Sequence, residues 1–324
     1  MRVVIALGGN ALIRAGERGH WDEQRRNALS AARAAARLRR AGHQIVLAHG
    51  NGPQVGMLAL QQACAADEAP GLPFDALVAM TQGQMGYLLQ QALGEVDRDL
   101  PTATILTRAV VAHDDPAFAS PPTKPIGPFY DEPEARRLAS ERGWAVGPDA
   151  GRGWRRLIAS PRPVQVVEHE HIALLARCGV VVVAAGGGGI PVTEARPPAD
   201  GLAGVEAVID KDRCATELAI QIGAEVLILT TGVQWVSFDY GTRWQRDMAR
   251  LTISDALRHL REGDFPAGSM GPKIESAVRF ASGNGRAVIT DPAHLSHVLD
   301  GGDGTWIVPD DEGPSRVAPT PAAA

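Results

Sequence analysis

The stretch "RVVIALGGNAL", residues 2–12, contains the pattern that decides the fold of this 324-residue chain. Five apolar residues, 3–7, run directly into Gly8 and Gly9. A short apolar run that is rich in β-branched residues and ends at glycine is typical of a buried strand. The run is shorter than the roughly 7–15 apolar residues of a secretory signal. We therefore interpret it as a first strand and expect a cytoplasmic protein.

The same unit of strand, turn and helix recurs along the chain. Short runs rich in Val, Ile and Leu alternate with longer stretches rich in Ala and Leu. The predicted strands are residues 3–7, 44–48, 104–107, 180–184, 226–230 and 287–290. The predicted helices are residues 22–40, 57–65, 75–96, 214–222, 253–262 and 273–282. This alternation predicts an α/β fold with a mostly parallel sheet between helices.

Residues 114–163 interrupt the alternation with a segment rich in Pro, Gly and Trp. A stretch of this length is not expected to be a plain loop in a compact domain. Its one clear helical pattern covers residues 132–142. We predict a small inserted subdomain that closes as a lid over a site from which water is excluded.

We predict that the chain consists of two lobes and a tail. The N-terminal lobe is expected to cover residues 1–192 and to carry the insert, and the C-terminal lobe to cover residues 193–309. The end of the chain, residues 310–324, reads "DDEGPSRVAPTPAAA" and is predicted to be a disordered tail because it has few residues that could be buried.

Composition excludes several classes of function. A formal net charge of −5 disfavours nucleic-acid binding and attachment to a membrane surface, because both favour a basic face. No apolar run approaches the roughly 20 residues that span a bilayer. The three cysteines lie far apart without Cys-x-x-Cys spacing, which fits a reducing compartment.

Three glycine clusters each follow a predicted strand. They are Gly8-Gly9-Asn10, Gly50-Asn51-Gly52 and residues 186–189. In parallel sheets ligands bind outside the carboxyl ends of the strands, where glycines let backbone N–H groups approach an anion. The clusters therefore predict an anion site. Neither the dinucleotide motif G-x-G-x-x-G nor the Walker A motif fits the glycines of this chain, which disfavours an NAD enzyme and a P-loop kinase.

Lysine is rare in this chain and is placed selectively. Of 32 basic residues only Lys124, Lys211 and Lys273 are lysines. An ammonium group on a flexible stem can follow a moving phosphoryl group, whereas the guanidinium of Arg is a rigid planar fork. We therefore interpret the three lysines as phosphate contacts. A metal site is not predicted: His169 and His171 could point to one face of a strand, but they have no third ligand nearby.

Six segments together resemble the carbamate kinases of the amino acid kinase family. They are "VVIALGGNAL", "LAHGNGPQVG", "PTKPIGP", "GGGGIPV", "GVEAVIDKD" and "AGSMGPK", and the likeness extends over about residues 2–308. The resemblance implies a three-layer αβα sandwich with the inserted subdomain. It also implies phosphoryl transfer between ATP and carbamate, giving ADP and carbamoyl phosphate, with Mg²⁺ bound to the nucleotide. The family is usually dimeric, so a homodimer is expected.

The resemblance also implies a role for each candidate residue. Lys124, Lys211, Asp212 and Lys273 are expected to be catalytic, with Asp212 holding the ammonium groups in register. The residues expected to bind carbamate and the transferring phosphate are Gly8, Gly9, Asn10, Gly50, Asn51 and Gly52. The residues expected to bind the nucleotide are Gly187, Gly188, Asp210, Lys211, Ser269, Met270 and Lys273. No residue is expected to bind a metal ion directly.

Two positions depart from the family pattern. Where carbamate kinases commonly read T-D-V-D-x-V-Y, this chain has Gln234 in place of an acidic residue and Ser237 in place of tyrosine. Two alternatives to a carbamate kinase stay open, and these two positions motivate the first of them. One is a non-catalytic protein that binds nucleotide or carbamoyl phosphate on the same fold, and the other is a kinase for a different small carboxylate.

Overall fold

The computed structural model describes residues 1–8, 12–14, 16–149, 153–195, 200–266, 270–283, 285–301 and 303–319. Its main sheet runs in the order β13-β14-β16-β15-β12-β1-β2-β9-β3, and β17 pairs with the outer side of β14. In this order the strands are β13 (Val236–Phe238), β14 (Arg246–Thr252), β16 (Thr305–Val308), β15 (Arg286–Thr290), β12 (Val226–Thr230), β1 (Arg2–Leu7), β2 (Gln44–His49), β9 (Val181–Val183) and β3 (Thr102–Thr104), with β17 at Arg316–Val317.

The centre of this sheet is parallel. Each neighbouring pair from β15 through β12, β1, β2 and β9 to β3 runs in the same direction. The carboxyl ends of these strands therefore lie at one edge. Gly8 and Gly50 follow directly from these ends, and Gly186 comes three residues after the end of β9, so the glycine clusters meet at that edge as expected.

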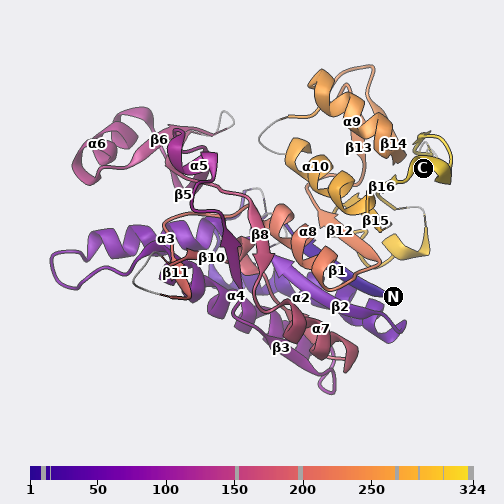
Figure 1. The fold of residues 1–324 in the computed structure, drawn as a ribbon, viewed down its shortest axis with the longest axis horizontal. Coiled ribbons are helices and arrows are strands. Elements are labelled where there is room, and N and C mark those ends of the chain that lie inside the picture. The colour runs from indigo at the N-terminus through magenta and orange to yellow at the C-terminus, as the bar shows by residue number, and fades with distance from the viewer. Residues whose placement is uncertain are drawn as a thin grey trace.

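Alternate residues of β1 face two different helix layers. Val4 and Ala6 pack in the cluster that contains residues of α7 (His169–Arg177), α8 (Lys211–Gln221) and α10 (Met270–Ala281). Val3 and Ile5 pack instead against α2 (Trp21–Arg40) and α4 (Phe74–Val96). Because side chains alternate across a strand, a run that is apolar throughout must be covered on both faces. The predicted αβα sandwich with a mostly parallel sheet is confirmed (Figure 1).

Two smaller sheets lie beside the main one. The first, in the order β11-β10-β4-β8, consists of β11 (Leu202–Gly204), β10 (Ile190–Glu194), β4 (Arg108–Val111) and β8 (Pro163–Val166). The predicted lobe boundary between residues 192 and 193 falls inside β10, so a division of the chain at that point would cut this sheet. The lobes themselves stay a prediction.

The second small sheet belongs to the insert. It consists of β5 (Lys124–Tyr130), β7 (Trp154–Ile158) and β6 (Ala145–Pro148), and α6 (Glu132–Arg142) coincides with the predicted helix. Figure 1 shows α6 and β6 projecting away from the main sheet, with the short α5 (Pro116–Ala119) between them and the body. The insert rests on α3 (Gly52–Cys64) through a close approach of two glycines, because a Cβ built at Gly56 would lie 1.8 Å from the Cα of Gly127.

Most predicted elements are present with shifted ends. The helix α9 (Ile253–Glu262) has the predicted bounds, whereas α3, α8 and α10 begin three to five residues earlier than predicted. For α8 the reason is an N-cap, since the Asp210 side chain accepts from the backbone N–H groups of Asp212 and Arg213. The strand predicted at 104–107 is wrong, because β3 ends at Thr104 and the backbone of Thr107 bonds instead to the side chain of Gln82.

The prediction of a disordered tail is wrong for residues 310–319. The 3-10 helix η3 covers Asp310–Glu312, and β17 pairs with β14. The Glu312 carboxylate bonds to Arg286, and the Ser315 hydroxyl donates to Asp255 at 2.6 Å. Polar contacts to the body order this segment although it has little to bury. Residues 320–324 lie outside the described part of the chain.

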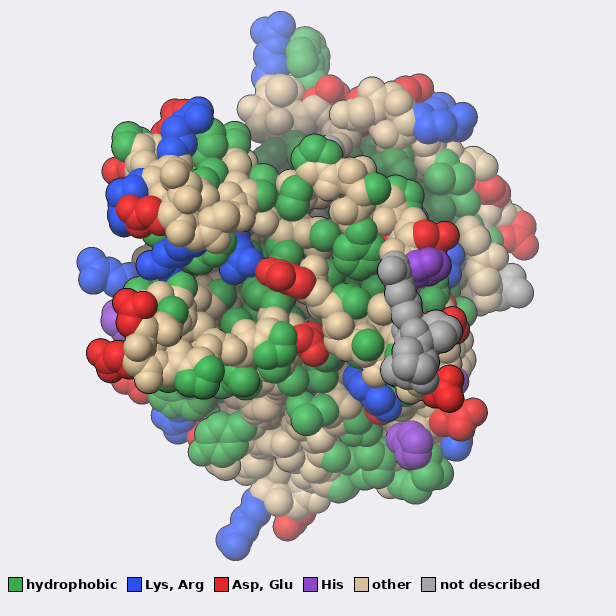
Figure 2. Space-filling model, turned by 60° about the vertical axis from the view of Figure 1, so that its left-hand side comes forward, with side chains coloured by type: hydrophobic (Ala, Val, Ile, Leu, Met, Phe, Trp, Pro, Cys, Tyr) green, Lys and Arg blue, Asp and Glu red, His purple; other side chains and the backbone are tan. Residues whose placement is uncertain are grey.

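The surface carries charges of both signs. On the face drawn in Figure 2, basic and acidic side chains are interspersed among apolar and other polar ones. None of the described helices is both long enough and apolar enough to cross a bilayer.

Candidate active site

Five charged residues form two neighbouring groups of ion pairs, which a hydrogen bond from the Asp212 backbone N–H to the Asp210 carboxylate joins into one ion cluster. Lys124 Nζ lies 2.5 Å from Asp210 Oδ2, Lys211 Nζ lies 2.5 Å from Asp212 Oδ1, and Lys273 Nζ lies 2.6 Å from Asp212 Oδ2. Lys124 is the first residue of β5, Lys211 is the first residue of α8, and Lys273 lies in the first turn of α10. These three elements are far apart in sequence. The structure thus brings together all three lysines of the chain, with Asp212 bridging two of them as expected.

This ion cluster is largely withdrawn from water. The side chains of Lys211 and Lys273 are 12% and 11% exposed, and that of Asp212 is 6% exposed. The Lys124 side chain, which belongs to the insert, is 34% exposed. Lys124 is therefore the cation of the cluster that solvent or a ligand reaches most easily.

Burial and mutual attraction shift the pKa values of the cluster in opposite directions. Burial favours the neutral form of Asp210, but the ammonium groups of Lys124 and Lys211 outweigh it and hold the pKa of this carboxyl well below its usual range. Burial lowers the pKa of Lys211 to about 8, although the Asp212 carboxylate opposes this effect. For Lys273 the same carboxylate outweighs burial and raises the pKa. The Asp212 carboxylate thus favours the charged form of both ammonium groups against the effect of burial.

The glycine turns adjoin this cluster. The Gly50 N–H donates to the carbonyl of Leu7 at 3.0 Å, and the Gly8 N–H donates to Thr230 Oγ1 at 2.7 Å, so the turns after β1, β2 and β12 are joined. The 3-10 turn η1 covers Gly186–Gly188. In it Gly187 has φ +65°, and a Cβ at this residue would lie 2.2 Å from the Asn51 side chain.

Gly188 connects the turns to the ion cluster. A Cβ at Gly188 would lie 2.2 Å from the carbonyl oxygen of Ile209, the residue directly before Asp210. The expected substrate and nucleotide residues therefore occupy one place at the carboxyl edge of the sheet. Met270, which was also expected in the site, begins α10 three residues before Lys273. Gly9, Asn10 and Ser269, which were also expected in the site, lie outside the described residues.

A layer of buried polar side chains beneath the turns was not predicted. His49, Thr81, Gln82 and Thr107 are each at most 1% exposed. The Asn51 amide donates to Thr81 Oγ1 at 2.8 Å, and the Ala185 N–H donates to Thr107 Oγ1 at 2.9 Å. A signal was present in the sequence: Thr81-Gln82 interrupts the apolar face of a predicted helix, and His49 ends an apolar strand directly before a glycine cluster.

The two departures from the family pattern each bond to an acidic partner. Gln234 Nε2 donates to Asp303 Oδ1 at 3.1 Å, and Ser237 Oγ donates to Asp247 Oδ1 at 2.6 Å. A carboxylate therefore lies beside each of these positions although neither residue is acidic. This arrangement is formed by tertiary contact and could not be predicted from the two residues alone.

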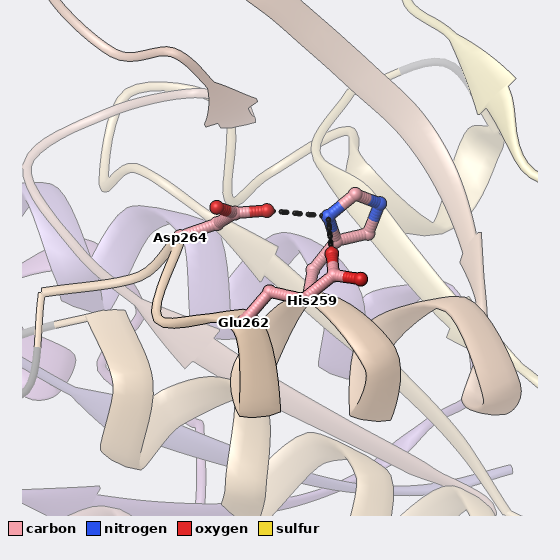
Figure 3. A group of neighbouring side chains, drawn as sticks. All are labelled: His259, Glu262 and Asp264. Carbon is pink, nitrogen blue, oxygen red and sulfur yellow. Dashed lines mark hydrogen bonds and ion pairs between the residues drawn. The ribbon is translucent and has the colours of Figure 1, made fainter.

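One group of potential metal ligands lies elsewhere in the described part of the chain. His259, Glu262 and Asp264 gather at the end of α9, where His259 Nδ1 lies 2.6 Å from Asp264 Oδ2 (Figure 3). The His259 ring packs against Phe238 at 3.9 Å between centroids, so these contacts hold the turn after α9 in place. His169 and His171 lie in the first turn of the helix α7, not on a strand.

A hollow on the described surface lies apart from the ion cluster. It has a volume of about 530 Å³, and it is lined by α7 and by Gln221 and Ile222 at the end of α8. Lys211 begins the same helix, so the hollow and the cluster lie at opposite ends of α8, roughly 15 Å apart by the helical rise.

Comparison with known proteins agrees with the geometry. The model of the amino acid kinase family matches residues 1–291. The carbamate kinase of Halobacterium salinarum is 46% identical over 310 residues, which cover 95% of this chain and 99% of the relative. The carbamate kinase of Pyrococcus horikoshii is 42% identical over 315 residues, with the same coverage of both chains.

Solved structures agree in fold over the same length. Carbamate kinase from Giardia lamblia bound to citric acid has a TM-score of 0.89 at 38% identity, and it covers 95% of this chain and 98% of its own. The same enzyme bound to AMP-PNP has a TM-score of 0.86. With a family model that matches most of its length and relatives of this identity, the chain belongs to the amino acid kinase family, among the carbamate kinases.

Proposed function

We propose that this chain catalyses reversible phosphoryl transfer between ATP and carbamate, with ADP and carbamoyl phosphate as the other pair. The observation that carries the proposal is the ion cluster. The chain's three lysines, from three distant segments, converge beside glycine turns at the carboxyl edge of a parallel sheet. The curated relatives of similar length are named carbamate kinases.

The reaction requires charge stabilisation more than covalent catalysis. A carbamate oxygen attacks the γ-phosphorus of ATP, the bond from that phosphorus to the β–γ bridging oxygen breaks, and ADP leaves with the electron pair. Carbamate is already an anion, so no base has to remove a proton from the attacking oxygen. Ammonium groups and backbone N–H groups that surround the transferring phosphoryl group suffice to lower the barrier.

Each part of the site takes a role in this proposal. The turns with Gly8, Gly50, Asn51 and Gly52 hold carbamate and the transferring phosphoryl group through N–H donors. Lys211 and Lys273 bind the nucleotide phosphates, and Asp212 keeps their ammonium groups in place. Lys124 leaves Asp210 and follows the phosphoryl group when the insert closes, which its greater exposure allows.

The charge balance of the cluster supports an anionic ligand. Three ammonium groups pair with two carboxylates, so the five groups carry a surplus of one positive charge. A nucleotide or an acyl phosphate brings the negative charge that this surplus attracts.

Mg²⁺ is proposed to enter with the nucleotide. Each carboxylate of the cluster is already bonded to an ammonium group, and Mg²⁺ usually keeps several waters and binds substrate phosphates. The residues therefore fit a metal ion carried by ATP or ADP better than one held by the protein. When bound, the ion neutralises charge on the phosphate oxygens.

The proposal also covers the direction of the reaction, the oligomeric state and the cellular location. Carbamoyl phosphate is a reactive mixed anhydride, so ATP synthesis is the favoured direction. A homodimer and a cytoplasmic location complete the proposal.

A coupled assay tests the function. Purified protein is mixed with ADP, Mg²⁺ and carbamoyl phosphate, and ATP is measured through hexokinase and glucose-6-phosphate dehydrogenase. We expect ATP in proportion to carbamoyl phosphate, and much less with acetyl phosphate. Absence of ATP above background would overturn the proposal, and faster turnover of another acyl phosphate would indicate a kinase for a different carboxylate.

A further inference from the structure

Two buried polar side chains beneath the glycine turns have no part in the proposed chemistry. His49 ends β2, and Gln82 lies in the middle of α4. Each is 1% exposed. A buried imidazole and a buried amide are costly unless their polar atoms are bonded, so their partners indicate why they are present.

His49 determines the orientation of one peptide group. Its Nδ1 lies 3.0 Å from the carbonyl oxygen of Gly50, and a carbonyl only accepts, so Nδ1 carries the proton. The Gly50 C=O and the Asn51 N–H belong to the same planar trans peptide and point in opposite directions. By holding the carbonyl, His49 fixes the direction of the Asn51 N–H. That N–H has no acceptor among the described residues, and Asn51 is the N-cap of α3.

The ring is kept neutral by its surroundings. Complete burial lowers the pKa of His49 to about 4, against the opposing bond to Gly50. At neutral pH the imidazole therefore contributes a single Nδ1–H donor and no charge.

Gln82 joins the other turn to the body of the protein. Its Nε2 donates to the carbonyls of Thr107 at 3.0 Å and Gly186 at 2.9 Å, and its Oε1 accepts from the Thr107 N–H at 2.7 Å. A Cβ at Gly186 would lie 2.4 Å from His49 Nε2, so both side chains touch the same glycine. The two residues thus form one support under the turns after β2 and β9.

We infer that His49 and Gln82 are positioning residues, which hold the two glycine turns so that their N–H groups meet carbamate and the transferring phosphoryl group. The inference rests on the proposed function. It places the turn after β9, with Gly187 and Gly188, at the transferring phosphoryl group, whereas the family resemblance implied contact with the nucleotide. It predicts an effect on the carbamoyl phosphate side of the site and little effect on the affinity for ADP, because ADP lacks that phosphoryl group and neither residue contacts the ion cluster.

Substitutions of His49 test the peptide orientation. His49→Leu removes the donor, whereas His49→Asn keeps an N–H donor at the δ position. We expect His49→Leu to raise KM for carbamoyl phosphate about tenfold or more, since a misplacement of about 1 Å costs up to ~10²-fold. We expect His49→Asn to stay within about threefold of the wild type, and Kd for ADP to change less than twofold in both variants.

A substitution of Gln82 tests the same support from the other side. Gln82→Glu places carboxylate oxygen against two carbonyl oxygens, so the turn at Gly186 is expected to shift and KM to rise about tenfold or more. Gln90→Glu is the matched control on the same helix. Gln90 Oε1 only accepts, from Thr104 Oγ1 at 2.6 Å, and a carboxylate also accepts, so this control is expected to leave KM within twofold.

Three results would overturn the inference. They are a wild-type KM in His49→Leu, an equal loss of ADP affinity in that variant, and a KM for His49→Asn no better than that for His49→Leu. If His49→Leu does not fold, His49→Gln takes its place, because the amide donor of glutamine lies at the ε position and not at the δ position. Equal KM values for the Asn and Gln variants would then contradict the inference.

Failure of the proposed function is read separately. It would appear as an inactive wild type, whereas failure of the inference appears in the ratio of variant to wild type. Hydrogen exchange of residues 49–54 and 184–189 needs no activity. Faster exchange of these segments in His49→Leu than in His49→Asn supports the positioning role, and equal exchange overturns it.

Discussion

The two halves of the site hold negative charge in different ways. The glycine turns offer backbone N–H groups, and their support is a layer of neutral, buried side chains such as His49 and Gln82. The ion cluster instead consists of charged side chains, which pair with one another and leave a surplus of one positive charge. In the proposed reaction a ligand leaves the bonds of the first half intact, whereas the ions of the second half exchange partners.

The difference suits the two jobs of a phosphoryl-transfer site. A small nucleophile has to be oriented, which requires fixed donors. A phosphoryl group that moves between two partners requires mobile charge. Substitutions in the two halves should therefore change the kinetic constants and the stability in different ways. The following predictions run from the largest expected effect to the smallest.

Asp212→Asn should have the largest effect. The variant leaves the ammonium groups of Lys211 and Lys273 buried side by side without their shared carboxylate. Breaking a buried pair in this way costs about 3–5 kcal/mol of unfolding free energy, and loss of the ordered ammonium groups should lower kcat by roughly 10²–10³-fold. Urea unfolding and the coupled assay measure both. The control Asp239→Asn, at an exposed residue with positive φ, should change stability by no more than about 1 kcal/mol; similar losses in both variants would contradict the role of Asp212.

Lys124→Arg should lower the rate but keep nucleotide binding. The guanidinium keeps the charge beside Asp210, but it is a rigid fork that follows a moving phosphoryl group poorly. We expect kcat to fall about 10²-fold, while Kd for ADP changes less than threefold. The control in the same insert is Arg137→Lys, an exposed residue that pairs with Glu134 and Glu141. Unaltered turnover of Lys124→Arg would exclude Lys124 from catalysis.

Gly56→Ala should disturb the contact between α3 and the insert. The new Cβ would lie 1.8 Å from the Cα of Gly127, so α3 and β5 must separate. Overpacking of this kind costs about 1–3 kcal/mol, and a displaced Lys124 should also reduce kcat. Gly83→Ala is the control, because a Cβ there meets nothing within 4 Å and alanine favours the helix by about 1 kcal/mol. Equal unfolding free energies for the two variants would refute the close approach.

The smallest effect concerns pH. The unfolded chain binds a proton at His49 below about pH 6.5, whereas burial lowers the pKa of the folded residue to about 4. Stability should therefore fall as pH drops from about 6.5 towards 4, and the share of His49 is about 1 kcal/mol at pH 5.5. His49→Asn lacks this titration. Its loss of unfolding free energy between pH 7 and 5.5 should be smaller than that of the wild type by this amount, and equal losses would show that the ring is not buried in neutral form.

Much of the fold could be predicted from local pattern. Apolar runs such as residues 3–7, which are covered on both faces, indicate parallel strands, and α6 and α9 were predicted with their observed bounds. The predicted starts of the helices were less accurate. The start of α8, for example, is fixed by hydrogen bonds to the Asp210 side chain, which the apolar periodicity of the sequence does not reveal. The strand predicted at 104–107 failed because a side chain from α4 takes the backbone bonds of Thr107.

The prediction of a disordered tail was wrong for a related reason. Residues 310–319 have little apolar surface, and composition alone indicates disorder. They are held by strand pairing and by bonds to Arg286 and Asp255, which are distant in sequence. Composition carries no information about partners that only the folded body supplies.

The sequence by itself determined which residues this chain could use: three lysines among many arginines, and glycines where strands end. Tertiary structure alone decided their pairing, with Asp212 between two ammonium groups, Lys124 on Asp210, and His49 and Gln82 under the turns. The physical reason is range. Strand and helix patterns follow from neighbours along the chain, whereas an ion pair or a buried hydrogen bond forms between groups that only the folded sheet brings within about 3 Å.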